Sequence, residues 1–268
     1  MLALHGITAT HMAWSVVAGL LPEVDLIAPD LRGRGRSAQL PGPYGFAAHA
    51  ADMMALLDAL DLDRVVVAGH SMGGFVAVSL ASRYPDRVTD LVLVDGGLPV
   101  GRPEDPAPEG GIDALLGPAA ARLAMTFPTR AAYHEFWRAH PAIGPMWGAA
   151  VQRYVDDDLI GEPPELRSSC REEAMRWDGA EVADNARNLA SLLRVGVPLR
   201  FLRAPRGLLD GAPLYRDEAV RRLLSAVPGA TWSTVPDTNH YSVLLGASGA
   251  AAVAGCLSGV LTRAGRAE

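Results

Sequence analysis

The chain contains no lysine and only two cysteines, Cys170 and Cys256, among its 268 residues. Two cysteines in a chain of this length do not make a disulfide framework, although the sequence does not exclude a single disulfide between them. The N-terminus lacks a charged region followed by a long apolar segment, as a signal peptide would have. No window reaches the ~18 uninterrupted apolar residues of a membrane span. We therefore expect a cytoplasmic protein that does not enter a membrane.

The charge of the chain argues against a nucleic-acid partner. The formal net charge is −6, and all 24 basic residues are arginines, which we attribute to the coding bias of a GC-rich genome. No histidine pair has the spacing of a metal site, so we expect no metal and no other cofactor. The partner that we expect is a small-molecule substrate, and nothing in the sequence indicates an oligomeric state.

Hydrophobic patterning predicts an α/β fold with a mostly parallel central sheet and flanking helices. Short apolar runs alternate with helical patterns, as in βαβ units, at both ends of the chain. We predict strands at 1–4, 24–28, 65–68, 91–94, 199–202 and 231–235, and helices at 47–60, 218–226 and 249–261. Residues 99–108 have the composition of a linker, and 112–193 carry helical patterns without a convincing strand. The predicted organisation is an α/β core, 1–97 and 196–268, interrupted by a helical cap, 98–195.

The most informative motif is Gly69-His70-Ser71-Met72-Gly73, which follows an apolar run and precedes a helical pattern. A short strand, a Gly-x-Ser-x-Gly turn and a helix form a nucleophile elbow, which exposes the serine oxygen at the top of a sheet. The turn is strained and needs small neighbours, which Gly69 and Gly73 provide. We predict that Ser71 is a nucleophile and that the Met72 N–H donates to the charge developing on an attacked carbonyl.

A serine nucleophile needs a base and an acid that orients it. Among seven histidines, His240 follows the last predicted strand, at the sheet edge where Ser71 should lie. Two carboxylates could hold it, since Asp210 and Asp95 each follow a predicted core strand. We slightly favour Asp210 and keep Asp95 open. A turn role for Asp210 and a strand-end cap for Asp95 are the structural alternatives.

Two glycine-rich segments complete the predicted edge. Ile7 follows a strand at the same edge, and its backbone N–H is the second predicted oxyanion donor beside that of Met72. The segment 30–37, Asp-Leu-Arg-Gly-Arg-Gly-Arg-Ser, we interpret as structural, with Asp30 and the arginines bonded to nearby backbone. The run 156–158 of three aspartates lacks the pattern of a calcium loop, so we interpret it as a solvated turn.

Taken in order, Leu-His-Gly, Asp-x-Arg-Gly-x-Gly-x-Ser, Gly-His-Ser-Met-Gly-Gly and Asn-His-Tyr resemble the α/β-hydrolase superfamily, in its serine-nucleophile branch with a helical cap. The resemblance covers nearly the whole chain. It implies that Ser71 is the nucleophile, His240 the base, and Ile7 and Met72 the oxyanion donors. Two departures stand out. The usual Gly-x-x-Asp register falls near Gly207, three residues before Asp210. The family's first hairpin is absent, so we expect either that the native chain starts earlier than this sequence or that the sheet has an exposed edge.

A serine at the elbow excludes the epoxide hydrolases and dehalogenases of this fold, which place aspartate there. It implies hydrolysis of a carboxylic ester, a lactone or a related acyl bond of a small to medium, largely apolar substrate. The alternatives are a carbon–carbon bond hydrolase or lyase, and a ligand-binding protein with a vestigial triad. The cap is rich in aromatic residues. Either they form its own small core or some of them line the substrate pocket, for which we select Trp137, Trp147 and Phe136.

Overall fold

The protein is built around a parallel sheet of short strands, whose central strands are mostly buried and whose edge strand Thr231–Thr234 is partly exposed. A computed structural model describes residues 1–102 and 115–264. In the described residues the sheet has five strands in the order β1-β2-β3-β6-β7, and all neighbouring pairs are parallel. These strands are β1 (Leu2–Leu4), β2 (Val65–His70), β3 (Val88–Val94), β6 (Leu199–Arg203) and β7 (Thr231–Thr234). Because both faces of such a sheet are covered, β2 is buried along its whole length and reads as a continuous apolar run.

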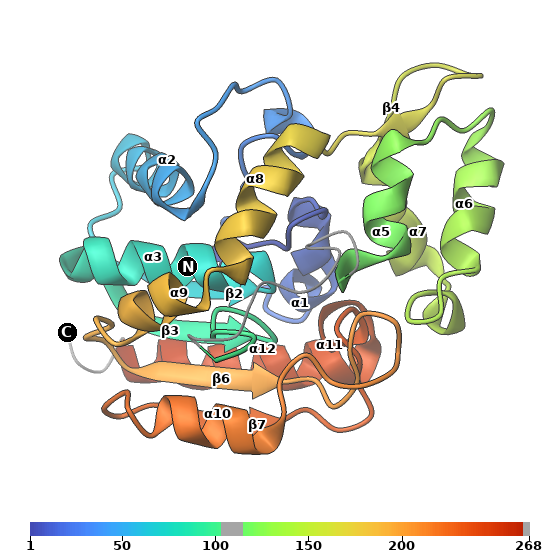
Figure 1. Ribbon diagram of the computed structural model, residues 1–268. Helices are drawn as coiled ribbons and strands as arrows, with labels where there is room; N and C mark the ends of the chain where they lie inside the picture. Colours follow the sequence, from blue (N-terminus) through green and yellow to red (C-terminus); the bar gives the residue numbers. More distant parts are fainter. Residues whose placement is uncertain (103–114, 265–268) are drawn as a thin grey trace.

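Helices cover both faces of this sheet (Figure 1). Two of them, α3 (Met72–Arg83) and α12 (Ala247–Ala264), lie on opposite sides, and α2 (Phe46–Ala59) packs on α3. The others outside the segment between β3 and β6 are η1 (His11–Trp14), α1 (Ser15–Gly19), η2 (Gly35–Ser37), η3 (Pro85–Arg87), α10 (Asp217–Leu224) and α11 (Ser242–Leu245). None of the described helices combines the length and apolar character needed to cross a bilayer.

The residues between β3 and β6, called here the inserted segment, are mostly helical where the structure describes them. Figure 1 shows α5, α6 and α7 beyond the carboxyl ends of the strands, whereas α8 and α9 return along α3. The elements are α5 (Pro118–Ala121), η4 (Arg122–Ala124), α6 (Arg130–Arg138), η5 (Gly144–Met146), α7 (Ala149–Asp157), β4 (Leu159–Ile160), β5 (Arg167–Ser168), α8 (Glu172–Ala183) and α9 (Asn185–Leu192).

The predicted elements agree with the structure in kind, with two exceptions. The segment 24–28 pairs with β1 only at Ile27, because a turn precedes it and Pro29, which has no N–H to donate, follows. The inserted segment holds the antiparallel pair β4 and β5, which the helical patterns concealed because each strand has two residues. Most of the predicted linker 99–108 lies outside the described residues.

Candidate active site

Ser71 lies at the turn between β2 and α3 in a backbone conformation that few side chains adopt. Its φ is 54° and its ψ is −125°. The Ser71 N–H donates to the Val94 carbonyl at 3.1 Å, which ties the turn to the neighbouring strand. A Cβ atom at Gly69 would overlap the Gly73 carbonyl, and one at Gly73 would overlap the Leu4 carbonyl. The glycines of the motif are therefore required by close backbone approach, as the sequence predicted.

His240 and Asp95 are brought together at the same edge. Asp95 follows β3 directly, and His240 lies in the loop between β7 and α11. The His240 Nδ1 lies 2.7 Å from Asp95 Oδ2, and both side chains are buried. Since a carboxylate only accepts, Nδ1–H is the donor and Nε2 keeps its lone pair. The other Asp95 oxygen accepts from the Ala204 N–H at 3.1 Å. Ala204 directly follows β6, so the end of that strand also holds the carboxylate in place.

Asp210 does not contact His240, which corrects the slight preference for Asp210 over Asp95 stated in the sequence analysis. Its Oδ1 accepts from the Asn239 Nδ2 at 2.9 Å and pairs with Arg206 Nε at 2.9 Å. The side chain is about one-third exposed. Asp95 comes directly after its strand, whereas Asp210 comes seven residues after the end of β6 at Arg203. Asp210 therefore braces the residue next to His240 and lies outside the buried pair.

His70 holds the loop that carries His240. Its Nε2 lies 2.8 Å from the His240 carbonyl, so Nε2–H is the donor. Burial, with a smaller contribution from the nearby His240 ring, holds the pKa of His70 well below its usual value. The imidazole is therefore neutral at neutral pH. His70 borders the same cavity as Ser71, and its hydrogen bond fixes the backbone of His240.

The two predicted oxyanion amides lie at the ends of neighbouring segments. Met72 is the first residue of α3, so its N–H has no acceptor within the helix. The Ile7 N–H donates to no protein oxygen within residues 1–102 and 115–264. Ile7 and Ser71 line two cavities in common, and Met72 lines one of them. The geometry therefore leaves two donors available beside the serine.

Two narrow cavities meet at Ser71. One, of about 30 Å³, is bordered by His240, Ile7, Tyr154, Tyr241 and Leu244, and the other, of about 20 Å³, by Met72, Phe75, Val182 and Leu214. Leu116 and Leu208 line both cavities.

No arginine, aspartate or glutamate borders either cavity among the described residues. A serine where two apolar cavities meet, with a carboxylate-held histidine and one free amide at the first cavity and a second free amide at the other, has the groups needed to attack an acyl carbonyl.

A family model described as alpha/beta hydrolase fold matches residues 1–190. The chain belongs to this hydrolase family. Among curated relatives, the lipase LipV of Mycobacterium tuberculosis is 45% identical over 94 residues, which are 35% of this chain and 36% of that protein. The chain therefore aligns with about one-third of that relative's length.

Solved structures share the fold of this α/β-hydrolase along nearly its whole length. An E-2-(acetamidomethylene)succinate hydrolase superposes with a TM-score of 0.76 and 20% identity, covering 98% of this chain and 91% of that one. An esterase from Thermogutta terrifontis has a TM-score of 0.68 and 22% identity, covering 98% and 89%. At these identities the likeness concerns the fold alone.

The three aromatic residues that the sequence placed in the substrate pocket of this α/β-hydrolase do not border either cavity. Phe136 and Trp137 pack on each other with ring centroids 5.7 Å apart, and Trp137 is almost fully buried. Trp147 packs beside His134 and under Arg138. They belong to an aromatic cluster within the inserted segment, which agrees with the alternative that these residues form its own core. Of the tyrosines at the cavity, Tyr241 adjoins His240 in the Asn-His-Tyr motif, whereas Tyr154 carried no sequence signal that separated it from core residues.

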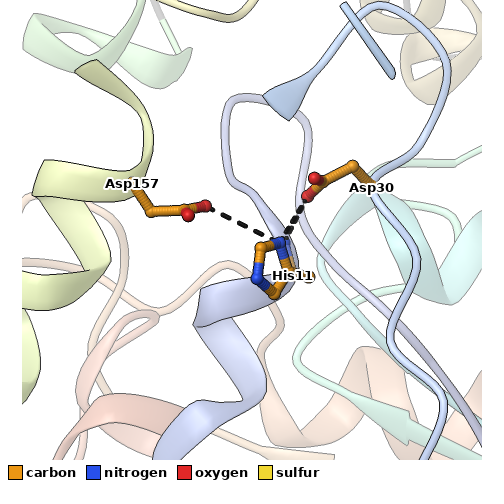
Figure 2. A group of neighbouring side chains, drawn as sticks. All are labelled: His11, Asp30 and Asp157. Atoms are coloured by element: carbon orange, nitrogen blue, oxygen red, sulfur yellow. Dashed lines mark hydrogen bonds and ion pairs between the residues drawn. The ribbon is translucent and has the colours of Figure 1, made fainter. Parts of the chain in front are cut away.

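One group of side chains in this α/β-hydrolase has the composition of a metal site. His11 lies between Asp30 and Asp157, its Nδ1 2.9 Å from Asp30 Oδ1 and 3.6 Å from Asp157 Oδ2 (Figure 2). Both Asp30 oxygens already accept backbone N–H groups, one from His11 and one from Arg36. These bonds fit the structural role that the sequence predicted for Asp30. Sequence spacing could not reveal this group because its members come from three separate segments.

Proposed function

We propose that this chain is a serine hydrolase that cleaves small, uncharged carboxylic esters or lactones through an acyl-enzyme. The observation that carries the proposal is the common cavity of Ser71, His240 and Ile7, with Asp95 buried behind the histidine. These groups support the proposal because acyl transfer requires a nucleophile, a base with an orienting carboxylate, and an amide that is free to donate.

In the proposed acylation step, Ser71 Oγ attacks the carbonyl carbon of the ester and transfers its proton to His240 Nε2. The carbonyl oxygen becomes an oxyanion that accepts from the Ile7 and Met72 amides. Asp95 stabilises the imidazolium and keeps Nδ1–H pointed at its own Oδ2. Collapse of this intermediate breaks the bond to the alkoxide, which takes the proton from His240 and leaves as the alcohol.

In the proposed deacylation step, water takes the place of the alcohol. His240 accepts a proton from the water while the water oxygen attacks the acyl carbon, and the same two amides stabilise the second oxyanion. Breaking the bond to Ser71 Oγ and returning the proton to that oxygen releases the carboxylic acid. One ester and one water thus give one alcohol and one acid, and the enzyme returns to its starting state.

The cavities support a short and uncharged substrate. Their walls are mostly apolar, with leucine the commonest residue and no arginine or acidic residue among the described neighbours. Burying a charged group there would cost several kcal/mol without a partner. Volumes of about 30 and 20 Å³ each hold only one or two water-sized groups. We therefore propose acyl groups of two to four carbons as the preferred substrates.

Turnover of p-nitrophenyl esters tests this proposal. We expect hydrolysis of the acetate and the butyrate, weaker hydrolysis of the octanoate and dodecanoate, and none above background with Ser71→Ala. The p-nitrophenyl monoester of succinic acid is the matched probe for charge, because its acyl chain has the length of butyrate but ends in a carboxylate. We expect it to react at least 10-fold more slowly than the butyrate.

Two results would contradict the proposal. Equal turnover by wild type and Ser71→Ala would exclude the serine mechanism. If well-folded protein turned over none of the esters, simple ester hydrolysis would be excluded. The result would then favour a carbon–carbon bond hydrolase, a lyase or a ligand-binding protein. Preference for the succinate monoester would retain the serine mechanism but overturn the proposed substrate class.

A further inference from the structure

Three consecutive carbonyls beside the serine are each held by a buried side chain. They belong to Gly6, Ile7 and Thr8, which we call the oxyanion loop because it carries the Ile7 N–H. The Gly6 carbonyl lies 2.8 Å from His5 Nδ1. His5 Nε2 accepts the Leu31 N–H at 2.9 Å, so the proton of this neutral ring is on Nδ1 and points to Gly6.

Arg34 holds the second carbonyl. Its Nε donates to the Ile7 carbonyl at 2.9 Å, and its Nη1 pairs with Asp178 of helix α8. Both charged side chains are completely buried. The remaining lone pairs of Asp178 are used as well, since it accepts from the Gly45 N–H and His49 Nε2. The pair therefore connects the oxyanion loop to the inserted segment through a buried guanidinium that is hydrogen-bonded at Nε and Nη1.

Arg122 holds the third carbonyl from within the inserted segment. Its Nη2 donates to the Thr8 carbonyl at 2.7 Å and to Asp158 Oδ2 at 2.9 Å. Asp158 also accepts from the Tyr133 hydroxyl at 2.6 Å and from Ser168 and Ser169, so it is not the solvated turn residue expected from the sequence. Burial opposes the charge on Arg122, but Asp158 together with Tyr133 and Cys170 outweighs it, and the pKa of the guanidinium is raised.

These contacts have a consequence for the reaction because an oxyanion donor works only in a fixed orientation. Displacing such a donor by less than 1 Å weakens its bond to the transition state far more than its bond to the ground state. The Ile7 N–H lies in the same peptide plane as the Gly6 carbonyl, and the next plane along the chain carries the Ile7 carbonyl. Holding the Ile7 and Thr8 carbonyls from one side leaves the loop little freedom to turn its N–H away from Ser71.

We propose that Arg122 and Arg34 are positioning residues that hold the oxyanion loop in its catalytic conformation. Through Arg122 and through Asp178, the inserted segment then completes the active site as well as covering it. This inference rests on the proposed function. Stability alone does not explain the arrangement, since a buried ion pair is often no more stabilising than apolar residues of similar size. Two such pairs converge on adjacent carbonyls of the loop that needs precise placement.

The double variant Arg122→Met/Asp158→Asn tests the proposal without leaving a buried carboxylate unpaired. The matched control is Arg130→Met, which removes an exposed arginine of the same segment that pairs with Asp156. Hydrogen–deuterium exchange of the peptide covering residues 5–9 reports on the loop without any need for turnover. Turnover of p-nitrophenyl butyrate is normalised to the burst of p-nitrophenol, which counts only the folded active sites.

We expect the double variant to exchange faster at residues 5–9 and to lose about 10-fold in kcat per active site, with KM within twofold of wild type. Arg122→Lys should recover part of the loss, because an ammonium can donate to the Thr8 carbonyl and to Asp158. Arg130→Met should match wild type in both measurements. Unchanged exchange in the double variant would overturn the proposal. Unchanged kcat per active site would also overturn it, even with a lower Tm, because the role of Arg122 would then be structural alone.

Failure of the proposed function has a different signature. Wild-type protein would then show no burst and no turnover, and the catalytic part of this proposal would fall with it. The exchange comparison would still decide whether Arg122 holds the loop, since it measures the backbone directly.

Discussion

His240 Nδ1 lies 2.7 Å from Asp95 Oδ2, and Asp95 has no exposed surface. The pair joins the end of β3 to the loop after β7, although 145 residues separate the two positions in the chain. The second Asp95 oxygen is fixed by the Ala204 N–H. A carboxylate bonded on both sides can hold the imidazole in one tautomer and one orientation.

The first prediction concerns this carboxylate. Asp95→Asn should lower kcat for p-nitrophenyl butyrate by about 10³- to 10⁴-fold, because an amide can hold His240 in the wrong tautomer. Asp210→Asn should lower kcat less than 10-fold, because Asp210 contacts Asn239 and Arg206. Comparing kcat of the two variants shows which aspartate orients His240. A larger loss with Asp210→Asn than with Asp95→Asn would reverse the assignment.

The second prediction concerns the aromatic cluster of the inserted segment. Trp137→Ala should lower the free energy of unfolding by about 3–5 kcal/mol, because it empties a buried site packed by Tyr133 and Phe136. The preference among ester chain lengths should stay as in wild type, since Trp137 borders neither cavity. Urea unfolding and the four p-nitrophenyl esters measure the two effects. A changed chain-length preference with unchanged stability would return Trp137 to the substrate pocket.

The third prediction concerns Leu208, which lines both cavities beside Ser71. Leu208→Ala removes most of its side chain from the point where the two cavities meet, so the octanoate should gain in kcat/KM relative to the acetate. We expect the ratio to rise at least 5-fold. Leu193→Ala is the matched control, because Leu193 is an exposed leucine and should leave the ratio as it is. An unchanged ratio in Leu208→Ala would mean that acyl chains bind elsewhere.

The fourth prediction concerns stability in acid. Burial lowers the pKa of His5 to about 4, and burial together with Arg122 lowers the pKa of His140 to about 4. In the unfolded chain both have the ordinary histidine pKa near 6.5. Their stabilisation is therefore fully present above pH 6.5 and is lost as the pH falls to 4, because the unfolded state takes up protons first.

Each of these histidines should contribute a loss of at most about 3 kcal/mol across that window. Urea unfolding of wild type and His140→Gln at pH 7 and pH 4.5 measures the contribution of His140. The variant should lose less stability than wild type between the two pH values. Equal losses would show that His140 is not held neutral by its surroundings.

Local patterns predicted the parts of the site that lie next to glycines or at strand ends. The elbow at Ser71 could be predicted because the serine lies within the glycine motif itself. The histidine could be predicted because it lies in the loop directly after the last strand. The choice between Asp95 and Asp210 could not be made from the sequence, because both follow neighbouring strands, β3 and β6, and the path of the seven residues between β6 and Asp210 is a tertiary property. The role of Arg122 could not be predicted either, since its contacts are to a backbone carbonyl 114 residues away and to Asp158.

The pattern of the inserted segment also shows where sequence reasoning fails. Tyr154 reaches the cavity from α7, whereas Trp137 and Phe136 on α6 face their own cluster. All three are aromatic residues on amphipathic helices, so helical spacing gives them the same signal. Which face meets the core depends on how α6 and α7 dock over the carboxyl ends of the strands, and this is a tertiary property.

Reaction with a fluorophosphonate tests the central claim most directly, because it needs an activated serine and no knowledge of the substrate. We expect one phosphonyl group per wild-type chain, located by peptide mass spectrometry on Ser71. Ser71→Ala should not be labelled, and Asp95→Asn should be labelled at least 100-fold more slowly. Absence of labelling in folded wild-type protein, or labelling at another serine, would contradict the claim that the His240–Asp95 pair activates Ser71.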